Sequence, residues 1–271
     1  MGDVDDYMRR LYVSNPLVEP VARPAIEALR LPVGSRGLDA GCGIGLQISL
    51  LLDAVAPGGH VTGLDLRSEF LSEAERVAEK SGLSGQVVRF QQGDIYRLPF
   101  DDETFDWLWS SNCAGYGTPE PLALVRELAR VVKPGGIVAI LIWSSQMLLP
   151  GYPLLEARLN ATPTGIAPFT SSMRPESHWL CALGWLRDAG LKEPAAHTVA
   201  VDFHAPLSKD IREALASLLD QRWGGARSEV TEKDWAEYQR LCQPESPDFI
   251  LDRPDYYAFF TESLFHGRVA E

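Results

Sequence analysis

The sequence predicts an α/β protein built on a doubly wound, mostly parallel sheet of seven strands, with helical insertions in its C-terminal half. Short apolar segments alternate with amphipathic segments along the first half of the chain, which is typical of strands separated by helices. The run Ile137–Trp143 is entirely apolar, as expected for a central strand covered on both faces. A chain of 271 residues can hold one large domain with insertions.

Each expected strand is a short apolar run, and each expected helix has apolar residues at three- and four-residue spacing. The strands are 36–40, 60–64, 87–91, 105–110, 137–143, 197–203 and 256–268. The helices are 46–56, 69–80, 122–132, 153–159, 176–189, 211–222 and 231–242. The helix 122–132 ends at the run Lys133-Pro134-Gly135-Gly136, because proline and glycine disfavour its continuation.

Three parts are expected along the chain. Residues 1–30 form an N-terminal helical cap, and residues 31–145 form the ligand-binding core. Residues 146–271 complete the sheet and carry two insertions, at about 146–175 and 205–247, where the regular alternation of strands and helices is interrupted. We expect these insertions to cover the substrate.

Composition argues against several classes of partner. The net charge is −12 and the isoelectric point is about 4.9, so nucleic acids and anionic membranes are disfavoured. The start of the chain, Met1–Arg10, lacks the apolar stretch of a signal peptide, and the run 137–143 is too short to span a bilayer. The four cysteines form no Cys-x-x-Cys pair, so we expect no metal site, no disulfide framework and a cytoplasmic location.

The run from Gly37 to Gly45 (GLDAGCGIG) is the most informative motif. Asp39 ends an apolar segment, glycines follow at 41, 43 and 45, and a helical pattern begins directly afterwards. Glycines in such a turn let backbone N–H groups approach a ligand closely. The spacing differs from the Gly-x-Gly-x-x-Gly of dinucleotide sites, and an acid here suits a ligand with an amine and a positive centre. This favours S-adenosylmethionine (SAM), although the glycines could serve only the turn.

Polar residues follow the next three predicted strands. Asp65 could accept both hydroxyls of a ribose, or could simply cap the following helix. Asp94 could accept a hydrogen bond from an adenine amine while Ile95 covers the ring, or could be an ordinary turn residue. Asn112 follows the fourth strand and could be a plain loop residue. In a doubly wound sheet these strand ends converge on one crevice.

Five ordered motifs resemble those of class I SAM-dependent methyltransferases, in the branch related to ubiquinone and menaquinone biosynthesis. They are Gly37–Gly45, Asp65, Gly93-Asp94 with Leu98-Pro99-Phe100, Phe105-Asp106-Trp107 and Arg130–Gly136. The resemblance covers about residues 20–145 and weakens after the sixth strand. It implies the cofactor SAM, with S-adenosylhomocysteine (SAH) as product, and a set of cofactor-binding residues. These are Asp39, Gly41, Cys42, Gly43 and Gly45 for the methionine part, Asp65 and Leu66 for the ribose, Asp94 and Ile95 for the adenine, and Asn112 near the sulfonium.

The expected reaction is transfer of a methyl group to a small, apolar or aromatic acceptor by in-line displacement. Composition suggests an acceptor pocket formed by the insertions and the first twenty residues, with Tyr12, Trp143 and His178 as lining candidates. Four further aromatic residues of this half would contribute: Phe169, Trp179, Trp223 and Trp235. No residue is assigned as a catalytic base.

Other classes of function share parts of this pattern. An NAD-dependent oxidoreductase would also have the strand–turn–helix and Asp65, but the glycine spacing and Asp94 disfavour it. An enzyme that uses SAM for different chemistry, or a SAM-binding protein without catalysis, would keep the whole set of motifs. A homodimer through the helical insertion is a further alternative.

Overall fold

The structure is a computed structural model that describes residues 2–83, 87–115, 117–169 and 173–271. Its seven-stranded sheet has the order β3-β2-β1-β4-β5-β7-β6. The strands are β1 (Arg36–Ala40), β2 (His60–Asp65), β3 (Val88–Gln92), β4 (Phe105–Ser111), β5 (Val132–Met147), β6 (Lys192–His204) and β7 (Tyr257–Arg268). The pairs β1–β2, β2–β3, β1–β4 and β4–β5 are parallel, and the strand order reverses between β1 and β4. The predicted doubly wound sheet is confirmed.

The last strand runs against its neighbours. Gly135 N donates to Val269 O, whereas further along β5 the hydroxyl of Ser144 donates to Thr261 O. Rising numbers on β5 therefore meet falling numbers on β7, which is an antiparallel pairing. The sheet is mixed, with its first five strands parallel.

Nine helices occur in the described residues, together with four short 3₁₀ turns. The helices are α1 (Gly2–Leu29), α2 (Ile48–Val55), α3 (Ser68–Lys80), α4 (Pro121–Arg130), α5 (Pro153–Asn160), α6 (Pro163–Ile166), α7 (Ala182–Asp188), α8 (Lys209–Trp223) and α9 (Glu232–Cys242). The 3₁₀ turns are η1 (Pro175–Ser177), η2 (Trp179–Cys181), η3 (Ala226–Ser228) and η4 (Ile250–Asp252).

The predicted helix 176–189 is wrong in its first half. This stretch holds the turns η1 and η2, and regular helix begins only at Ala182. His178, between the two turns, has extended backbone angles, and its ring Nδ1 accepts the N–H of Leu180 at 3.2 Å. This local hydrogen bond offers the backbone an alternative to continuing the helix. Strands β5 and β6 are also longer than predicted, because apolar content marked only the middle of β5 and the C-terminal part of β6.

Contacts divide the chain into two compact units. We call residues 22–143, 173–199 and 262–271 the sheet unit, and residues 1–21, 144–172 and 200–261 the helical unit. Strands β5, β6 and β7 and helix α1 contribute residues to both. The expected insertions 146–175 and 205–247 fall largely in the helical unit, and residues 170–172 lie outside the described residues.

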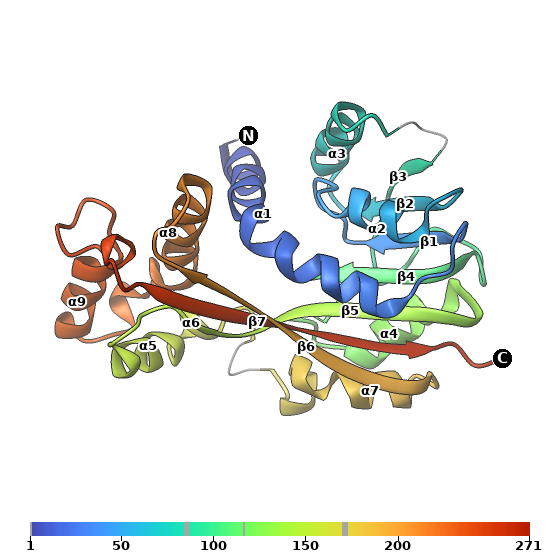
Figure 1. Ribbon diagram of the computed structural model, residues 1–271. Helices are drawn as coiled ribbons and strands as arrows, with labels where there is room; N and C mark the ends of the chain where they lie inside the picture. The colour runs from blue at the N-terminus through green and yellow to red at the C-terminus, as the bar shows by residue number, and fades with distance from the viewer. Residues whose placement is uncertain (1, 84–86, 116, 170–172) are drawn as a thin grey trace. The chain divides into compact units, whose positions relative to one another are not determined.

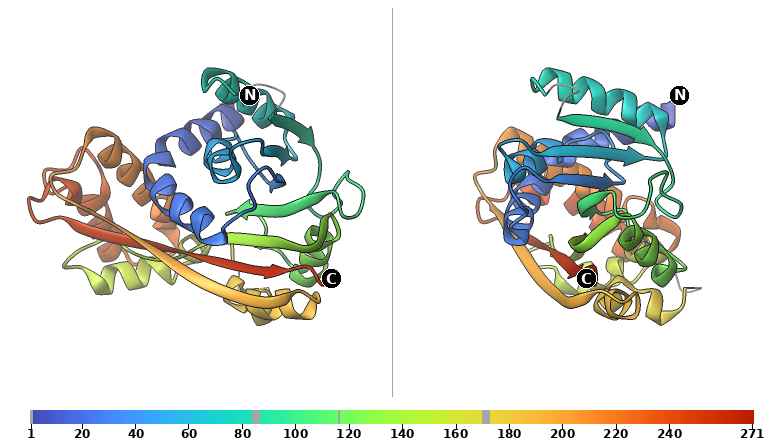
Figure 2. Two further views of the ribbon diagram at one scale, coloured as in Figure 1. Left: turned by 45° about the vertical axis from the view of Figure 1, so that its right-hand side comes forward. Right: turned by 90° about the vertical axis from the view of Figure 1, so that its right-hand side faces the viewer.

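In the sheet unit, helices cover both faces of the sheet (Figures 1 and 2), and a hydrophobic layer lies on each face. One layer joins α2 and the second half of α1 to the strands, and it includes the wholly buried Trp107 and Trp109. The other layer joins α4 and α7 to the opposite face, and it includes Leu128 and Trp185. This arrangement leaves the carboxyl ends of β1, β2 and β4 as the edge at which the predicted ligand-binding residues lie.

The helical unit is held by packing among α5, α6, α8 and α9. The side chain of Trp223 on α8 is fully buried, and its Nε1 donates to Asn160 Oδ1 at 3.0 Å. Arg158 on α5 forms a bidentate pair with Asp234 on α9, at 2.7 and 2.9 Å. Trp223 therefore packs inside the unit.

Gly37 tests the packing of the central strand. A Cβ added there would lie 2.1 Å from the ring of the fully buried Trp107, and the ring has no space to retreat. We expect Gly37→Ala to lower the free energy of unfolding by about 2 kcal/mol or more. Gly184→Ala is the matched control, because its Cβ would meet only Arg187 Nη2 at 3.7 Å. That change should be neutral or stabilise α7 by up to about 1 kcal/mol. Urea denaturation of both variants makes the comparison, and equal midpoints would contradict this description of the core.

Candidate functional site

The glycine loop between β1 and α2 has a backbone that only glycine adopts readily. Gly41, Gly43 and Gly45 have φ angles of +83°, +54° and +76°. The loop is fastened to the end of β2, because the N–H groups of Gly41 and Cys42 donate to Leu64 O at 2.8 and 2.9 Å. The first residues after β1 are thereby held beside the carboxyl end of β2.

The loop also packs tightly against the residue that follows Asn112. A Cβ added to Gly41 would lie 2.2 Å from Cys113 Sγ, and one added to Gly45 would lie 3.1 Å from Ala74 Cβ. The glycines thus allow both the turn and the close approach of Cys113 after β4 and of Ala74 on α3. Cys42 and Cys113 are free cysteines, and burial raises the pKa of both thiols well above the usual value. Both cysteines are therefore poor thiolates.

Asp39 is a buried acid at the end of β1. Its side chain is 3% exposed, and burial, followed by the charge of Asp65, raises its pKa to about 7. An isolated carboxylate in such surroundings is costly, so a positively charged group beside it would stabilise the ionised form. An ammonium group of a ligand fits this requirement.

Asp65 links β2 to the glycine loop. Its Oδ2 accepts the N–H of Gly43 at 2.9 Å, and its Oδ1 accepts the N–H of Arg67 at 3.0 Å. Each carboxylate oxygen has a second lone pair, so both can still accept a hydroxyl group. Arg67, and not Asp65, occupies the N-cap position of α3. Leu66 is 63% exposed beside Asp65 and offers an apolar surface there.

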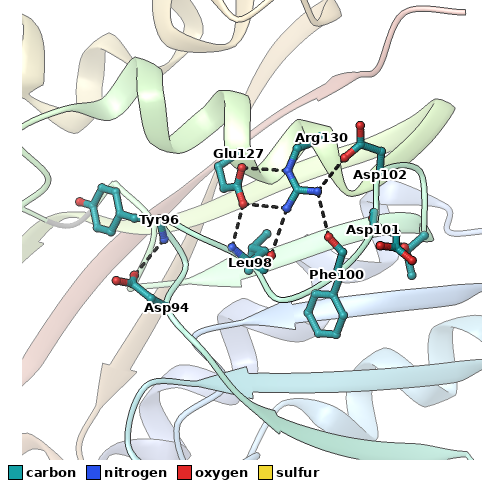
Figure 3. A network of polar contacts seen from close by, with 9 residues as sticks. Asp94, Tyr96, Leu98, Phe100, Asp101, Asp102, Glu127 and Arg130 are labelled. Atoms are coloured by element: carbon teal, nitrogen blue, oxygen red, sulfur yellow. Dashed lines mark hydrogen bonds and ion pairs between the residues drawn. The ribbon is translucent and has the colours of Figure 1, made fainter.

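Asp94 lies in a short turn after β3. Its Oδ1 accepts the N–H of Tyr96 at 2.9 Å (Figure 3). This is the geometry expected if Asp94 is an ordinary turn residue. Ile95 is partly buried against the hydrophobic layer that includes Leu98. The turn geometry and a contact with adenine are compatible, because Oδ2 is a separate acceptor.

The segment after Asp94 is fixed by Arg130 on α4. This guanidinium donates to Leu98 O at 3.1 Å, to Phe100 O at 2.9 Å and to Asp102 Oδ1 at 2.7 Å (Figure 3). Glu127 accepts from Arg130 and from Leu98 N, and these hydrogen bonds hold the pKa of Glu127 below its usual value. Helix α4 thereby positions the turn that carries Asp94 and Ile95.

Asn112 stands in the left-handed region directly after β4, with a φ of +48°. Its Oδ1 accepts the N–H of Trp143 at 2.8 Å, and its Nδ2 donates to Glu262 Oε1 at 3.1 Å. The side-chain amide is therefore held from both sides. Glu262 is the residue that sequence reasoning missed, since 150 positions separate it from Asn112. The available signal was an acid among buried apolar residues at alternate positions of β7.

The residues predicted to line the acceptor pocket differ in burial and in the unit to which they belong. Tyr12 lies on α1 in the helical unit and is 39% exposed, while Trp143 is half-buried near the end of β5 in the sheet unit. His178 caps η2 through its ring nitrogen, and burial lowers the pKa of its imidazole. Trp223 and Trp235, which sequence reasoning placed in the pocket, are buried within the helical unit.

Two absences concern the described residues. Within them no three His, Cys, Asp or Glu side chains are grouped in a way that could hold a metal ion. No helix in those same ranges has the length and apolar content to cross a bilayer.

Comparison with known proteins agrees with this site. Residues 38–140 match a family model described as a methyltransferase domain. The chain is 36% identical over 119 residues to demethylmenaquinone methyltransferase of Bacillus licheniformis, an alignment that covers 43% of this chain and 48% of that relative. The corresponding enzyme of Staphylococcus aureus is 35% identical over 127 residues, which are 46% of this chain and 49% of that enzyme. The chain thus spans about half the length of the curated relatives it matches.

One solved structure supports the fold along most of the chain. A candidate methyltransferase from Bacillus halodurans C-125 superposes with a TM-score of 0.57 and 21% identity, over 92% of this chain and 99% of that one. At this identity the likeness establishes the fold alone.

The order of the sheet, the glycine loop and the family match together place residues 38–140 in the methyltransferase-domain class with the class I fold. Residues 38–140 are a methyltransferase domain, and SAM is the cofactor of this class.

Arg130 provides a test of how the site is held. Arg130→Ala removes every hydrogen bond from this guanidinium to the segment 98–102, so we expect faster amide hydrogen exchange across residues 94–103. The free energy of unfolding should fall by about 1–3 kcal/mol. Arg126→Ala on the same helix is the control, because Arg126 makes only a 3.5 Å contact with Asp188 O. Unchanged exchange in Arg130→Ala would show that α4 does not position this segment.

Proposed function

We propose that this protein transfers the methyl group of SAM to a small acceptor of apolar or aromatic character. The observation that carries the proposal is the glycine loop, which follows Asp39 at the end of β1 and is hydrogen-bonded to Asp65 at the end of β2. The buried acid Asp39 suits an amino group, and Asp65 suits a ribose. A ligand with both groups would satisfy the two carboxylates together.

The cofactor-binding roles follow from these positions. Asp39 and the loop Gly41–Gly45, including Cys42, would hold the methionine part, and Asp65 with Leu66 would hold the ribose. Asp94 and Ile95 would hold the adenine, supported through the contacts of Arg130. Asn112, directly after β4, would lie near the sulfur. Each of these roles is part of the proposal and can be tested by substituting the residue.

When bound, SAM supplies a methyl group on a positively charged sulfur, and an acceptor nucleophile displaces the sulfur in line. The donor is already activated, so the main task of the protein is orientation, which can lower a barrier by several kcal/mol. The glycine loop and Asp65 supply this by fixing the ligand at two points. The rigid amide of Asn112 would limit movement near the reacting centre.

The acceptor class rests on relatives and composition. The curated relatives are named demethylmenaquinone methyltransferases, and their alignments cover 43% and 46% of this chain. The half-buried aromatic Trp143, beside Asn112, is the side chain we assign to acceptor contact. A quinol or another small aromatic acceptor is therefore the first class to assay.

Calorimetric titration with SAM, SAH and NAD tests the cofactor assignment. We expect the first two ligands to bind with micromolar affinity and NAD to show no binding. Asp65→Ala should weaken SAM and SAH binding by at least about tenfold, because it removes the ribose acceptor and the bond to Gly43. Asp53→Ala, on α2 away from the strand ends, is the control. Binding of NAD, or the absence of binding by either adenosyl ligand, would refute the proposal.

The pKa of Asp39 predicts how SAH binding depends on pH. An ammonium beside Asp39 favours its ionised form, so SAH affinity should rise up to about tenfold per pH unit as pH increases toward 7. Above pH 7 the carboxylate is already ionised, and the rise should stop. Asp39→Asn should remove this dependence and weaken binding. A flat wild-type profile between about pH 5.5 and 7 would show that Asp39 does not face the amine.

A further inference from the structure

A single acid interrupts the buried row on β7. Ala258, Phe260, Glu262 and Leu264 alternate along this strand, and every one of them has 0% exposure. Three are apolar, as burial requires, and the fourth carries a carboxyl group. A carboxyl group at such a position costs stability unless another group compensates it.

The compensation that the structure offers to Glu262 is incomplete. Its Oε1 accepts the Nδ2–H of Asn112 at 3.1 Å, whereas its Oε2 has no hydrogen-bond partner among the described residues. Asn112 cannot turn to serve both oxygens, because its own Oδ1 is engaged by Trp143 N at 2.8 Å. The unpartnered oxygen is therefore a built-in feature of this arrangement.

The charge state of Glu262 responds to this isolation. Burial raises its pKa to about 7, against a smaller opposite effect of the Asn112 hydrogen bond. The flanking strands carry Lys133 on β5 and five ionisable groups on β6: Lys192, Glu193, His197, Asp202 and His204. On α1, whose Ala25 and Ile26 share a hydrophobic layer with Leu264, Arg23 and Glu27 are exposed. On β7 itself, His266 interacts with His197 and Arg268. None of these groups is among the causes of the shift.

Glu262 is connected to the glycine loop through two neighbouring residues. Asn112 holds its carboxyl group, and the next residue, Cys113, lies 2.2 Å from the position of a Cβ on Gly41. All of these residues belong to the sheet unit. Glu262 is therefore joined to the glycine loop through Asn112 and Cys113, which directly follow β4.

We propose that Glu262 is the counter-charge for the positive sulfur of the methyl donor, so that this site distinguishes SAM from SAH. The inference rests on the proposed function and deepens it, since it assigns a residue to the one part in which donor and product differ. A carboxylate with an unpartnered oxygen is stabilised by a nearby cation and gains little from a neutral thioether.

Binding of SAM, but not of SAH, should change the number of protons bound to Glu262. In the empty protein near neutral pH, Glu262 is partly protonated, and SAM binding lets it ionise and release that proton to solvent. With SAH bound, the sulfur is neutral and Glu262 keeps the proton. Asp39 behaves differently, because both ligands carry the amino group that would face it. The expected difference in proton release between SAM and SAH therefore comes from Glu262, and the Asp39 variant checks this.

Proton release can be measured by titration calorimetry in two buffers of different ionisation enthalpy. The experiment uses SAM and SAH as probes at about pH 6, where the α-amino groups of both ligands are protonated. We expect wild type to release up to about one proton more with SAM than with SAH, and the difference to vanish above about pH 8. Glu262→Gln, which keeps the shape of the side chain, should abolish the difference. At about pH 8 this variant should bind SAM at least tenfold more weakly, with SAH affinity changed by less than about twofold.

Asp39→Asn is the matched acid variant, and it should keep the SAM–SAH difference in proton release. Equal release with both ligands in wild type would overturn the role of Glu262 while leaving the proposed function intact. A difference that persists in Glu262→Gln would assign it to another group and would also overturn the inference. Absence of binding by either ligand would instead remove the proposed function itself. If Glu262→Gln does not fold, equal proton release by wild type with SAM and SAH would still overturn the inference.

Discussion

The attachment of the glycine loop to the end of β2 is the constraint on which the site depends. Leu64 O accepts two N–H groups of the loop, and Asp65 accepts a third from Gly43. These bonds require backbone angles at 41, 43 and 45 that residues with a Cβ rarely adopt. This attachment joins the loop that follows Asp39 to Asp65 at the end of β2. Strand pairing in the sheet and backbone geometry in the loop therefore act together to place the two carboxylates.

Two buried acids of the sheet unit then define what the site can bind. Asp39 and Glu262 both have a pKa raised to about 7, mainly by burial. A folded-state pKa above the unfolded value means that each acid lowers the stability of the empty protein as pH rises from about 4 to 7. A ligand with two positive groups would recover this loss. We infer that the empty protein tolerates two buried acids whose ionisation is unfavourable, because bound SAM would supply an ammonium and a sulfonium to stabilise them.

The remaining strand ends are held by contacts from outside the binding edge. Arg130 fixes the segment after β3 from α4, and Trp143 on β5 fixes the amide of Asn112 after β4. The ligand-facing residues are thus supported by rigid helices and strands. This suits a reaction in which orientation is the main contribution of the protein. Acceptor recognition would then fall to parts of the chain outside residues 38–140, which match the methyltransferase domain.

The sequence by itself determined the first five strands, the glycine loop and the carboxylates at the strand ends. These depend on local patterns, and the predicted helix 69–80 accordingly differs from α3 by one residue. Only the tertiary structure decided which side chains are buried and what they touch. It showed Trp223 inside the helical unit, broke the predicted helix 176–189 at His178, and joined Glu262 to Asn112 across 150 positions. The physical reason is that burial and desolvation depend on neighbours distant in sequence, and these raise the pKa of Glu262 and leave one of its oxygens without a partner.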